Sequence, residues 1–289
     1  MSSTTRGLAW VLLGGLLFVL FIVSVRFVGS DLPAVQAAFI RYGFSVVLVL
    51  PVILRSGPAV LRTRRLGRHG LRGLVHGCGV LLWFYAITRL PVAEATALSY
   101  TSPIFVALGA FLLLGERASL VRIVSTLIGL AGILVILRPG VIPIGAGAIA
   151  ILCSAPLFAA SKLLVKSLLV EDDSATTVIY LSLFATLTML VPAIYVWQPP
   201  ELAELALLML AAAFATLSHY TLARGLKLVD VTVAQPVEFL MLVWSTLFGI
   251  VLFGESPSIW VWVGAAVIVF SVWLASAGEG RRVSSRRQN

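Results

Sequence analysis

The sequence contains few charged residues, and most of those it has are basic. Asp, Glu, Lys and Arg together make up 11% of its 289 residues, whereas about a quarter of the residues in an average soluble domain are charged. Hydrophobic residues make up 60%, and the mean hydropathy is +1.06. Because so few charges cannot cover the surface of a water-soluble globule, the composition excludes a soluble enzyme.

Cysteine and histidine are also scarce. Cys78 and Cys153 lie in long apolar runs without CxxC spacing, so they indicate neither a disulfide framework nor a metal site. The three histidines, His69, His76 and His219, form no HExxH motif, and no paired-carboxylate motif is present. An intramembrane enzyme is therefore a remote alternative. The absence of GxxxxGK[ST] excludes a self-contained ATP-driven pump, and no cofactor is expected.

Long apolar runs are abundant instead. A bilayer core requires about 20 predominantly apolar residues per helix. Runs bounded by charge, Pro or Gly predict ten spans, at 8–28, 33–54, 71–89, 93–114, 120–137, 143–165, 176–197, 203–225, 231–254 and 258–277. The expected fold is therefore an all-α integral membrane protein with ten transmembrane helices.

The distribution of positive charge predicts the orientation of these spans. With the N-terminus inside, 17 of the 21 Lys and Arg residues fall in cytoplasmic segments, including the run from Arg62 to Arg72. Only Arg26, Arg89 and Arg138 fall outside. Positive charge concentrates on the cytoplasmic side of membrane proteins. We therefore expect a multi-pass protein of the bacterial inner membrane with both termini cytoplasmic, and contact of the basic run with lipid headgroups rather than nucleic acid.

The two halves of the chain resemble each other. "LLLGE" ending at Glu116 matches "VLFGE" ending at Glu255 at an offset of 139, and Tyr85 matches Tyr220 at 135. Further matches at an offset of 140 pair Gly7 with Gly147, Phe18 with Phe158 and Arg26 with Lys166. Because each half has five spans, an odd number, the second half is inverted relative to the first. We expect repeats at 1–140 and 141–280, a basic cytoplasmic tail at 281–289, and a central cavity at the repeat interface.

These features resemble the drug/metabolite transporter superfamily, EamA type. The segments from Leu90 to Glu116 and from Ala234 to Glu255 are similar to the fourth and ninth helices of that family. The resemblance implies a cavity lined by spans 1, 3, 4, 6, 8 and 9. It also implies export of amino acids, other metabolites or drugs, with import by some members. Length and span count are similar to the branch of aromatic-amino-acid exporters.

Aromatic residues within the spans suggest an outer cavity layer. Trp83 and Tyr100 lie six and seven residues from the outer ends of their spans, a common level roughly 10 Å below the outer interface. We expect Trp83, Tyr85 and Tyr100 to line the outer part of the cavity, although interhelical packing is an alternative for each. We also expect Phe18, Phe158, Trp244 and Ser245 to line the cavity.

Polar and ionisable residues suggest a second layer nearer the cytoplasm. Its expected members are His76, Lys162, His219, Gln235 and Glu238. Ionisable residues within spans usually face protein or water and indicate function. Glu238 could receive a substrate ammonium group or a coupling proton, or it could be a fixed ion-pair partner of Lys162, Arg224 or a histidine. For Arg41, on a helix that the family places peripherally, an ion pair or snorkelling is favoured over substrate contact.

Prolines interrupt several spans, and Pro103 and Pro236 fall on expected cavity helices. A proline removes a backbone hydrogen bond and permits a kink. We therefore expect these two residues to serve as hinges for the rocking motion of alternating access.

Together these patterns predict a secondary transporter that moves small metabolites by alternating access. An exporter of aromatic or large neutral amino acids with broad selectivity is the leading interpretation. A transporter of drugs, nucleotide-sugars or other metabolites with the same fold is the alternative. The sequence allows a monomer, and it leaves the direction of flux and the choice between proton coupling and facilitated diffusion open.

Overall fold

The protein is described by a computed structural model, and all its regular secondary structure within the described residues is helical. The described residues are 2–28, 32–87, 89, 98–99, 101–114, 120–138, 145–238, 240–254, 258–260, 262–267, 269–271 and 273–274.

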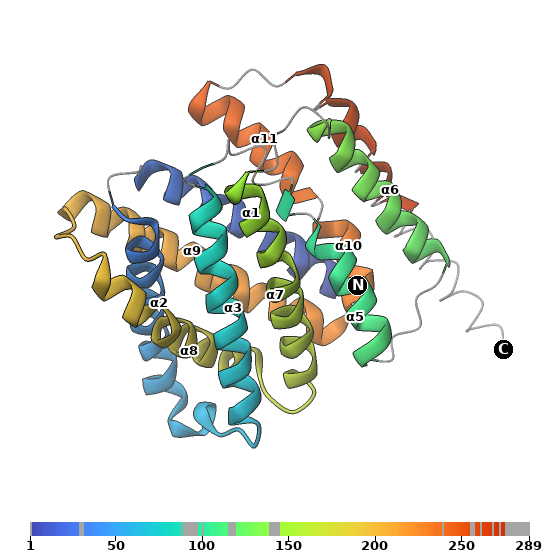
Figure 1. The fold of residues 1–289 in the computed structure, drawn as a ribbon. Helices are drawn as coiled ribbons and strands as arrows, with labels where there is room; N and C mark the ends of the chain where they lie inside the picture. The colour runs from blue at the N-terminus through green and yellow to red at the C-terminus, as the bar shows by residue number, and fades with distance from the viewer. Residues whose placement is uncertain are drawn as a thin grey trace.

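The helices follow the expected spans closely (Figure 1). The first half contains α1 (Ser3–Val28), α2 (Ala34–Ser56), the 3-10 helix η1 (Pro58–Leu61), α3 (Leu66–Ile87), α5 (Ser102–Leu114) and α6 (Leu120–Leu137). The second half contains α7 (Ala146–Leu168), α8 (Ser174–Tyr195), α9 (Leu202–Leu228), α10 (Val231–Glu238) and α11 (Leu240–Phe253). Five of them, α1, α2, α7, α8 and α9, are long and apolar enough to cross a membrane. The all-α membrane fold expected from hydropathy is confirmed.

One expected span is not a single continuous helix. The fourth was expected over 93–114, but Thr101 lies in a turn and α5 begins at Ser102, so Pro103 is the second residue of that helix. A proline in the first turn removes no intrahelical hydrogen bond. The ninth was expected over 231–254, and α10 (Val231–Glu238) and α11 (Leu240–Phe253) cover this range on either side of residue 239, which lies outside the described residues. In contrast, Pro51, Pro156 and Pro192 lie inside uninterrupted helices.

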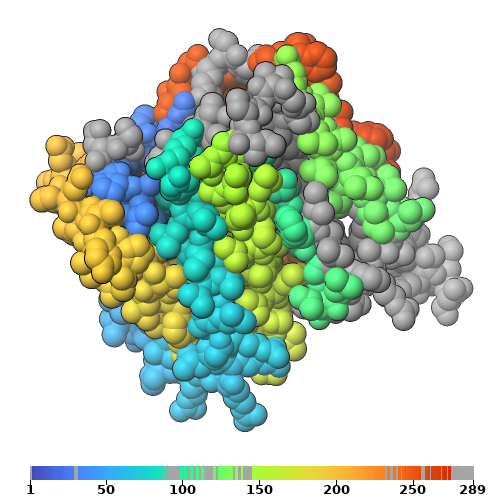
Figure 2. Space-filling view, in the orientation of Figure 1, coloured from blue at the N-terminus to red at the C-terminus, as the bar shows by residue number. Residues whose placement is uncertain are grey.

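The two halves interlock in a symmetric pattern. The helix α1 packs on α9, and α3 packs on α7. Exchanging the halves converts the first of these pairs into the second, because span 1 corresponds to span 6 and span 3 to span 8. The contact of α5 with α7 corresponds in the same way to the contacts of α1 with α10 and α11, and α2 packs on its own equivalent, α8. Figure 2 shows α3 and α7 side by side on one face, with α8 beside α3. This is the architecture of two inverted five-helix repeats.

Glycines permit the closest of these helix contacts. Gly7 of α1 and Gly225 of α9 lie against each other, and a Cβ on Gly225 would lie 2.7 Å from Val11 Cγ2 and 3.0 Å from the Gly7 carbonyl oxygen. Lipid gives little hydrophobic driving force between helices, so membrane helices associate through close packing at small residues. The α1–α9 interface therefore depends on the missing side chains of Gly7 and Gly225.

The outer faces of the helices are apolar. Large hydrophobic side chains are strongly exposed on α2, α5, α6, α8 and α11, among them Leu54, Leu113, Leu120, Val191, Tyr195 and Val251. In water, an apolar surface of this extent would make molecules of the protein associate with one another. In a bilayer it contacts the acyl chains.

The connection before α3 is fastened to the connection between α7 and α8. Arg65 donates from Nε to a carboxylate oxygen of Glu171 at 2.9 Å, and Asp172 accepts from Thr63 at 3.0 Å and contacts His69 Nε2 at 2.9 Å. The basic run was expected to contact lipid headgroups. For Arg65 this expectation is wrong, because its guanidinium group is hydrogen-bonded to the Glu171 carboxylate of the other half.

Replacing Gly225 by valine is expected to destabilise the protein. The new side chain would collide with Val11 and the Gly7 backbone, and overpacking of this kind typically costs about 1–3 kcal/mol. Thermal unfolding of the purified protein in detergent should therefore begin at a lower temperature than for wild type.

The matched control is Gly43→Val, which also places a branched residue inside a helix. Nothing lies within 4 Å of a Cβ built on Gly43, so only the small effect of helix propensity should remain. Equal destabilisation by both variants would contradict the close-packing explanation.

Candidate substrate cavity

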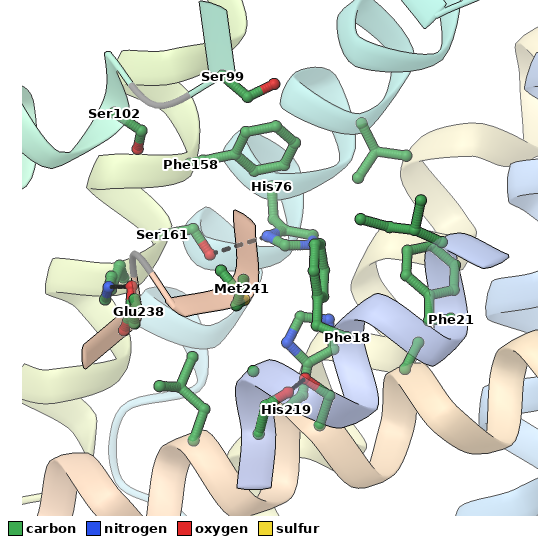
Figure 3. Close-up of a pocket in the computed structure, with 18 of the residues that line it drawn as sticks. Phe18, Phe21, His76, Ser99, Ser102, Phe158, Ser161, His219, Glu238 and Met241 are labelled. Atoms are coloured by element: carbon green, nitrogen blue, oxygen red, sulfur yellow. Dashed lines mark hydrogen bonds and ion pairs between the residues drawn. The ribbon is translucent and has the colours of Figure 1, made fainter. Parts of the chain in front are cut away.

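A cavity of about 280 Å³ lies between the two halves (Figure 3). Small-molecule sites commonly occupy about 300–1,000 Å³, so this cavity is near the lower end of that range. Its walls come from α1, α2, α3, α5, α7, α9, α10 and α11, together with Ser99. Spans 1, 3, 4, 6, 8 and 9 were expected to line it, and all of them contribute. The contribution of α2 was not expected.

Most of the residues expected in the cavity are found there. Eight line it, and they are Phe18, His76, Trp83, Phe158, Lys162, His219, Glu238 and Ser245. Tyr100 lies outside the described residues, and the side chains of Gln235, Pro103 and Pro236 are also not described. Lining a cavity does not by itself establish contact with a substrate, so their roles stay predictions.

Two aromatic predictions are wrong as to location. Tyr85 is 40% exposed and absent from the cavity wall, and its ring lies 3.6 Å below the Arg89 guanidinium. Residues two positions apart on a helix point in different directions, and on α3 Trp83 lines the cavity whereas Tyr85 does not. Trp244 is not a lining residue either, although its neighbour Ser245 is. Trp244 Nε1 is buried without a hydrogen-bond partner among the described residues.

A hydrogen-bonded chain centred on His76 connects three helices. Its Nε2 lies 2.6 Å from Tyr42 Oη on α2, and its Nδ1 lies 3.2 Å from Ser161 Oγ on α7. The rings of Phe158 and His219 meet the imidazole edge to face, with centroids 5.4 and 5.5 Å away. Because all of its ring edges and both nitrogens are engaged, His76 has a fixed orientation in the cavity wall.

Lys162 and Glu238 form an ion pair at the cavity. The pair joins α7 to the last residue of α10, immediately before α11 begins. The Oε1 atom of Glu238 is buried with no hydrogen-bond partner in the described part of the chain. Of the two roles that the sequence left open for Glu238, the structure therefore favours a fixed partner for Lys162.

Sequence reasoning missed two arginines in the wall. Arg72 was expected on the cytoplasmic side, and Arg41 was expected to pair or snorkel. Both line the cavity and are buried, with 3% of Arg41 and 4% of Arg72 exposed. The physical reason is that α3 begins at Leu66, five residues earlier than the expected span, so Arg72 lies well inside the helix.

A signal for Arg72 was present in the sequence. Arg72, His76, Val80 and Trp83 are spaced three or four residues apart and form one stripe on α3, and all four line the cavity. For Arg41 and its neighbour Tyr42, no comparable pattern was available.

The cavity wall is built from duplicated positions that have diverged. Phe21 and Ile22 on α1 correspond, at an offset of 140, to Ser161 and Lys162 on α7, and all four line the cavity. In the same way Trp83 and Phe84 on α3 correspond, at an offset of 135, to Ser218 and His219 on α9. The first half supplies the apolar member of each of these pairs, and the second half supplies the polar member.

This divergence gives the cavity two different ends. Inverted repeats place equivalent residues at opposite depths in the membrane, so the aromatic group lies towards one end and the polar group towards the other. Phe18 and Phe158, which are equivalent and both aromatic, are shared between the halves. The cavity therefore suits a molecule that has an aromatic part and a polar part.

Packed apolar side chains close the end of the cavity near the start of α1. Val11, Val106 and Val165 line the cavity and belong to a buried cluster built from α1, α5, α7, α9 and α10. Beyond the cluster, Lys166 Nζ donates to the carbonyl oxygens of Leu226 and Val229, both at 2.7 Å. Within the described residues, these packed side chains fill this end of the cavity.

Comparison with known proteins identifies several relatives. A riboflavin transporter of Rhizobium johnstonii is 34% identical over 284 residues, which cover 97% of this chain and 94% of that protein. An S-adenosylmethionine uptake transporter of Rickettsia prowazekii is 28% identical over 289 residues, covering 100% of this chain and 98% of that protein. A solved crystal structure with 22% identity has a TM-score of 0.79 and matches 96% of this chain and 99% of its own.

The solved structure supports the fold alone, because its sequence identity is low. The model of the EamA-like transporter family matches residues 5–138 and again residues 145–277. The chain therefore belongs to the EamA-like transporter family of the drug/metabolite transporter superfamily, and it is a membrane transporter.

Proposed function

We propose that this protein is a secondary transporter of the bacterial inner membrane that takes up a flat heteroaromatic metabolite of the riboflavin type. The observation that carries the proposal is the mixed lining of the cavity, which combines the aromatic side chains of Phe21, Trp83 and Phe158 with polar and charged side chains. A flavin has the matching shape, with a planar ring system and a hydroxylated chain. The relatives named for riboflavin and for S-adenosylmethionine uptake support the same substrate class.

An amino-acid exporter, the leading interpretation from sequence, is less well supported. A free amino acid carries an ammonium group that needs an anionic partner in a low-dielectric site. Glu238 is the one carboxylate among the described lining residues, and Lys162 already pairs with it. The relatives named above are named as transporters of riboflavin and of S-adenosylmethionine, and neither is named as an exporter of free aromatic or large neutral amino acids.

S-adenosylmethionine is the second candidate substrate, and one observation disfavours it. The described cavity wall contains Arg41, Arg72 and Lys162 against Glu238, a formal excess of positive charge with the histidines counted as neutral. A sulfonium cation would be repelled by this excess. A neutral flavin would not be repelled.

The proposed orientation in the membrane indicates which side of the cavity is closed in this structure. The distribution of positive charge supports cytoplasmic termini, and the packed cluster lies near the start of α1 and the end of α9. The closed end then faces the cytoplasm. Delivery of substrate requires this cluster to separate while the opposite end closes, as alternating access between inverted repeats demands.

Riboflavin uptake provides the direct test. Proteoliposomes containing the protein should accumulate radiolabelled riboflavin, with competition by unlabelled riboflavin and little competition by phenylalanine or S-adenosylmethionine. Inhibition of riboflavin uptake by phenylalanine at equal concentrations would instead support the amino-acid interpretation.

Substitution of Trp83 should impair binding more than substitution of Tyr85. Trp83 lines the cavity and donates from Nε1 to Ser99 Oγ at 3.1 Å, whereas Tyr85 lies outside the wall. Loss of one stacking aromatic commonly costs about 1–3 kcal/mol, so Trp83→Ala should raise KM for riboflavin by about tenfold or more. Tyr85→Ala should leave KM within about twofold of wild type.

Both variants replace a large aromatic residue in the same turn of α3, so each controls for the other. Their amounts in the membrane are compared by immunoblotting before uptake is measured. A larger effect of Tyr85→Ala would contradict the assignment of the cavity wall.

Breaking the Lys162–Glu238 pair on one side should be more damaging than removing both charges. Removal of one partner of a buried pair leaves an uncompensated charge, at a typical cost of about 3–5 kcal/mol, whereas an apolar replacement of both is often neutral. We expect Glu238→Leu to lower the thermal stability in detergent. The double variant Lys162→Met/Glu238→Leu should recover most of the loss.

The single variant Lys162→Met completes the double-mutant cycle. If the two single effects simply added in the double variant, the ion pair would contribute nothing to stability and the explanation would be wrong.

A further inference from the structure

The most unusual feature of the cavity is a pair of buried arginines without anionic partners. Arg41 of α2 and Arg72 of α3 both line the cavity and are more than nine-tenths buried. No ion pair joins either of them to a described carboxylate. Glu238, the carboxylate of the described cavity wall, is engaged by Lys162.

We propose that Arg41 and Arg72 form a receptor for the hydrogen-bond acceptors on one edge of the substrate's ring system. The ligand chemistry is that of a pyrimidinedione, in which two ring carbonyls flank an imide nitrogen, as in a flavin. The inference rests on the proposed function and extends it by assigning the residues that form hydrogen bonds with the polar edge of the ring.

Several guanidinium donors are available for this role. Arg41 Nε and Nη1 and Arg72 Nε are buried and have no hydrogen-bond partner in the described part of the structure. A buried charged donor left unpaired is costly, and an arginine at membrane depth generally marks a substrate or ion pathway. Both side chains line the cavity, so a rotation of either guanidinium group on binding would offer these covered nitrogens to an acceptor on the substrate.

The surrounding contacts hold both arginines in position. The Arg41 guanidinium carbon lies 3.3 Å from the centre of the Tyr42 ring and 5.1 Å from that of Phe21. The Tyr42 hydroxyl is in turn fixed by His76 at 2.6 Å. Arg72 Nη1 donates to the Thr177 carbonyl oxygen at 2.8 Å. Each side chain is thus anchored by part of its guanidinium group and keeps other donors free.

The chemistry of the ring edge matches these donors. Guanidinium is planar, remains charged and presents donors suited to planar acceptors. Neighbouring ring carbonyls carry partial negative charge that two fixed cations stabilise. Phe21, next to Arg41, is also a cavity residue, so a ring bound by Arg41 would lie against an aromatic surface.

The experiment compares riboflavin with N3-methylriboflavin, whose methyl group blocks the imide edge without changing the charge or the ribityl chain. Proteoliposomes with wild-type protein, Arg41→Gln, Arg72→Gln and the control Arg62→Gln are assayed for uptake of each compound. Arg62 is exposed and lies outside the cavity wall, so its variant tests the effect of removing one positive charge elsewhere.

The expected result is a loss of discrimination in the cavity variants. Wild type and Arg62→Gln should prefer riboflavin over N3-methylriboflavin by about tenfold or more, because the methyl group between the two ring carbonyls would keep the guanidinium donors from reaching them and leave those donors unpaired. Arg41→Gln and Arg72→Gln should raise KM for riboflavin by about tenfold, and their preference should fall to within about twofold.

Each other outcome is decisive. Equal uptake of the two flavins by wild type would by itself overturn the inference. Because this comparison uses only wild-type protein, it remains valid even if a variant fails to fold. The same preference in wild type, Arg41→Gln and Arg72→Gln, all inserted at normal levels, would also overturn it. So would an equal loss of affinity for both flavins, because the arginine would then act elsewhere on the substrate. Absence of riboflavin uptake by wild type would instead overturn the proposed function, together with the substrate edge assigned here.

Discussion

The contact between the two halves is the interaction on which the rest of the structure depends. The pairs α1–α9 and α3–α7 contribute to the cavity wall from both halves, and α3, α7 and α9 carry Arg72, His76, Lys162 and His219 of that wall. Backbone and side-chain polar groups cannot face lipid without a large cost. The buried charges are therefore possible only where one half covers the other. Gly7 and Gly225 permit that coverage because a side chain at either position would separate α1 from α9.

Duplication supplies the frame of the cavity, and divergence supplies its polarity. The equivalent pairs Phe21 and Ser161, and Phe84 and His219, occupy the same wall positions in the two halves. If both members of each pair had stayed alike, the two ends of the cavity would be chemically equivalent. A symmetric fold can rock between two states, while an asymmetric lining gives a bound molecule a defined orientation.

Hydropathy and the internal repeat were sufficient to predict the helices, whereas the spans expected to line the cavity came from the resemblance to the family. They succeeded because the requirement for apolar residues in a bilayer acts on every position of a span. Side-chain direction was harder to predict. Trp83 and Tyr85 have similar depth and chemistry, and only the helical register places the first in the wall and the second outside it. Arg72 was misplaced because its charge marks the end of an apolar run, although α3 continues beyond that run. The sequence does not distinguish a buried arginine from an exposed one, so the role of such a residue can be assigned only once the position of the neighbouring half is known.

The arrangement of charge also bears on the transport cycle. An empty cavity that closes from both sides would have to retain water around the free nitrogens of Arg41 and Arg72 or leave them unpaired. A substrate with suitable acceptors removes this penalty, so the occluded state is stabilised when it is loaded. A ligand shifts a conformational equilibrium only through such a difference in its interaction with the two states. In this protein the same two arginines that would select the substrate would also favour closure around it, which couples recognition to movement without any contact outside the cavity.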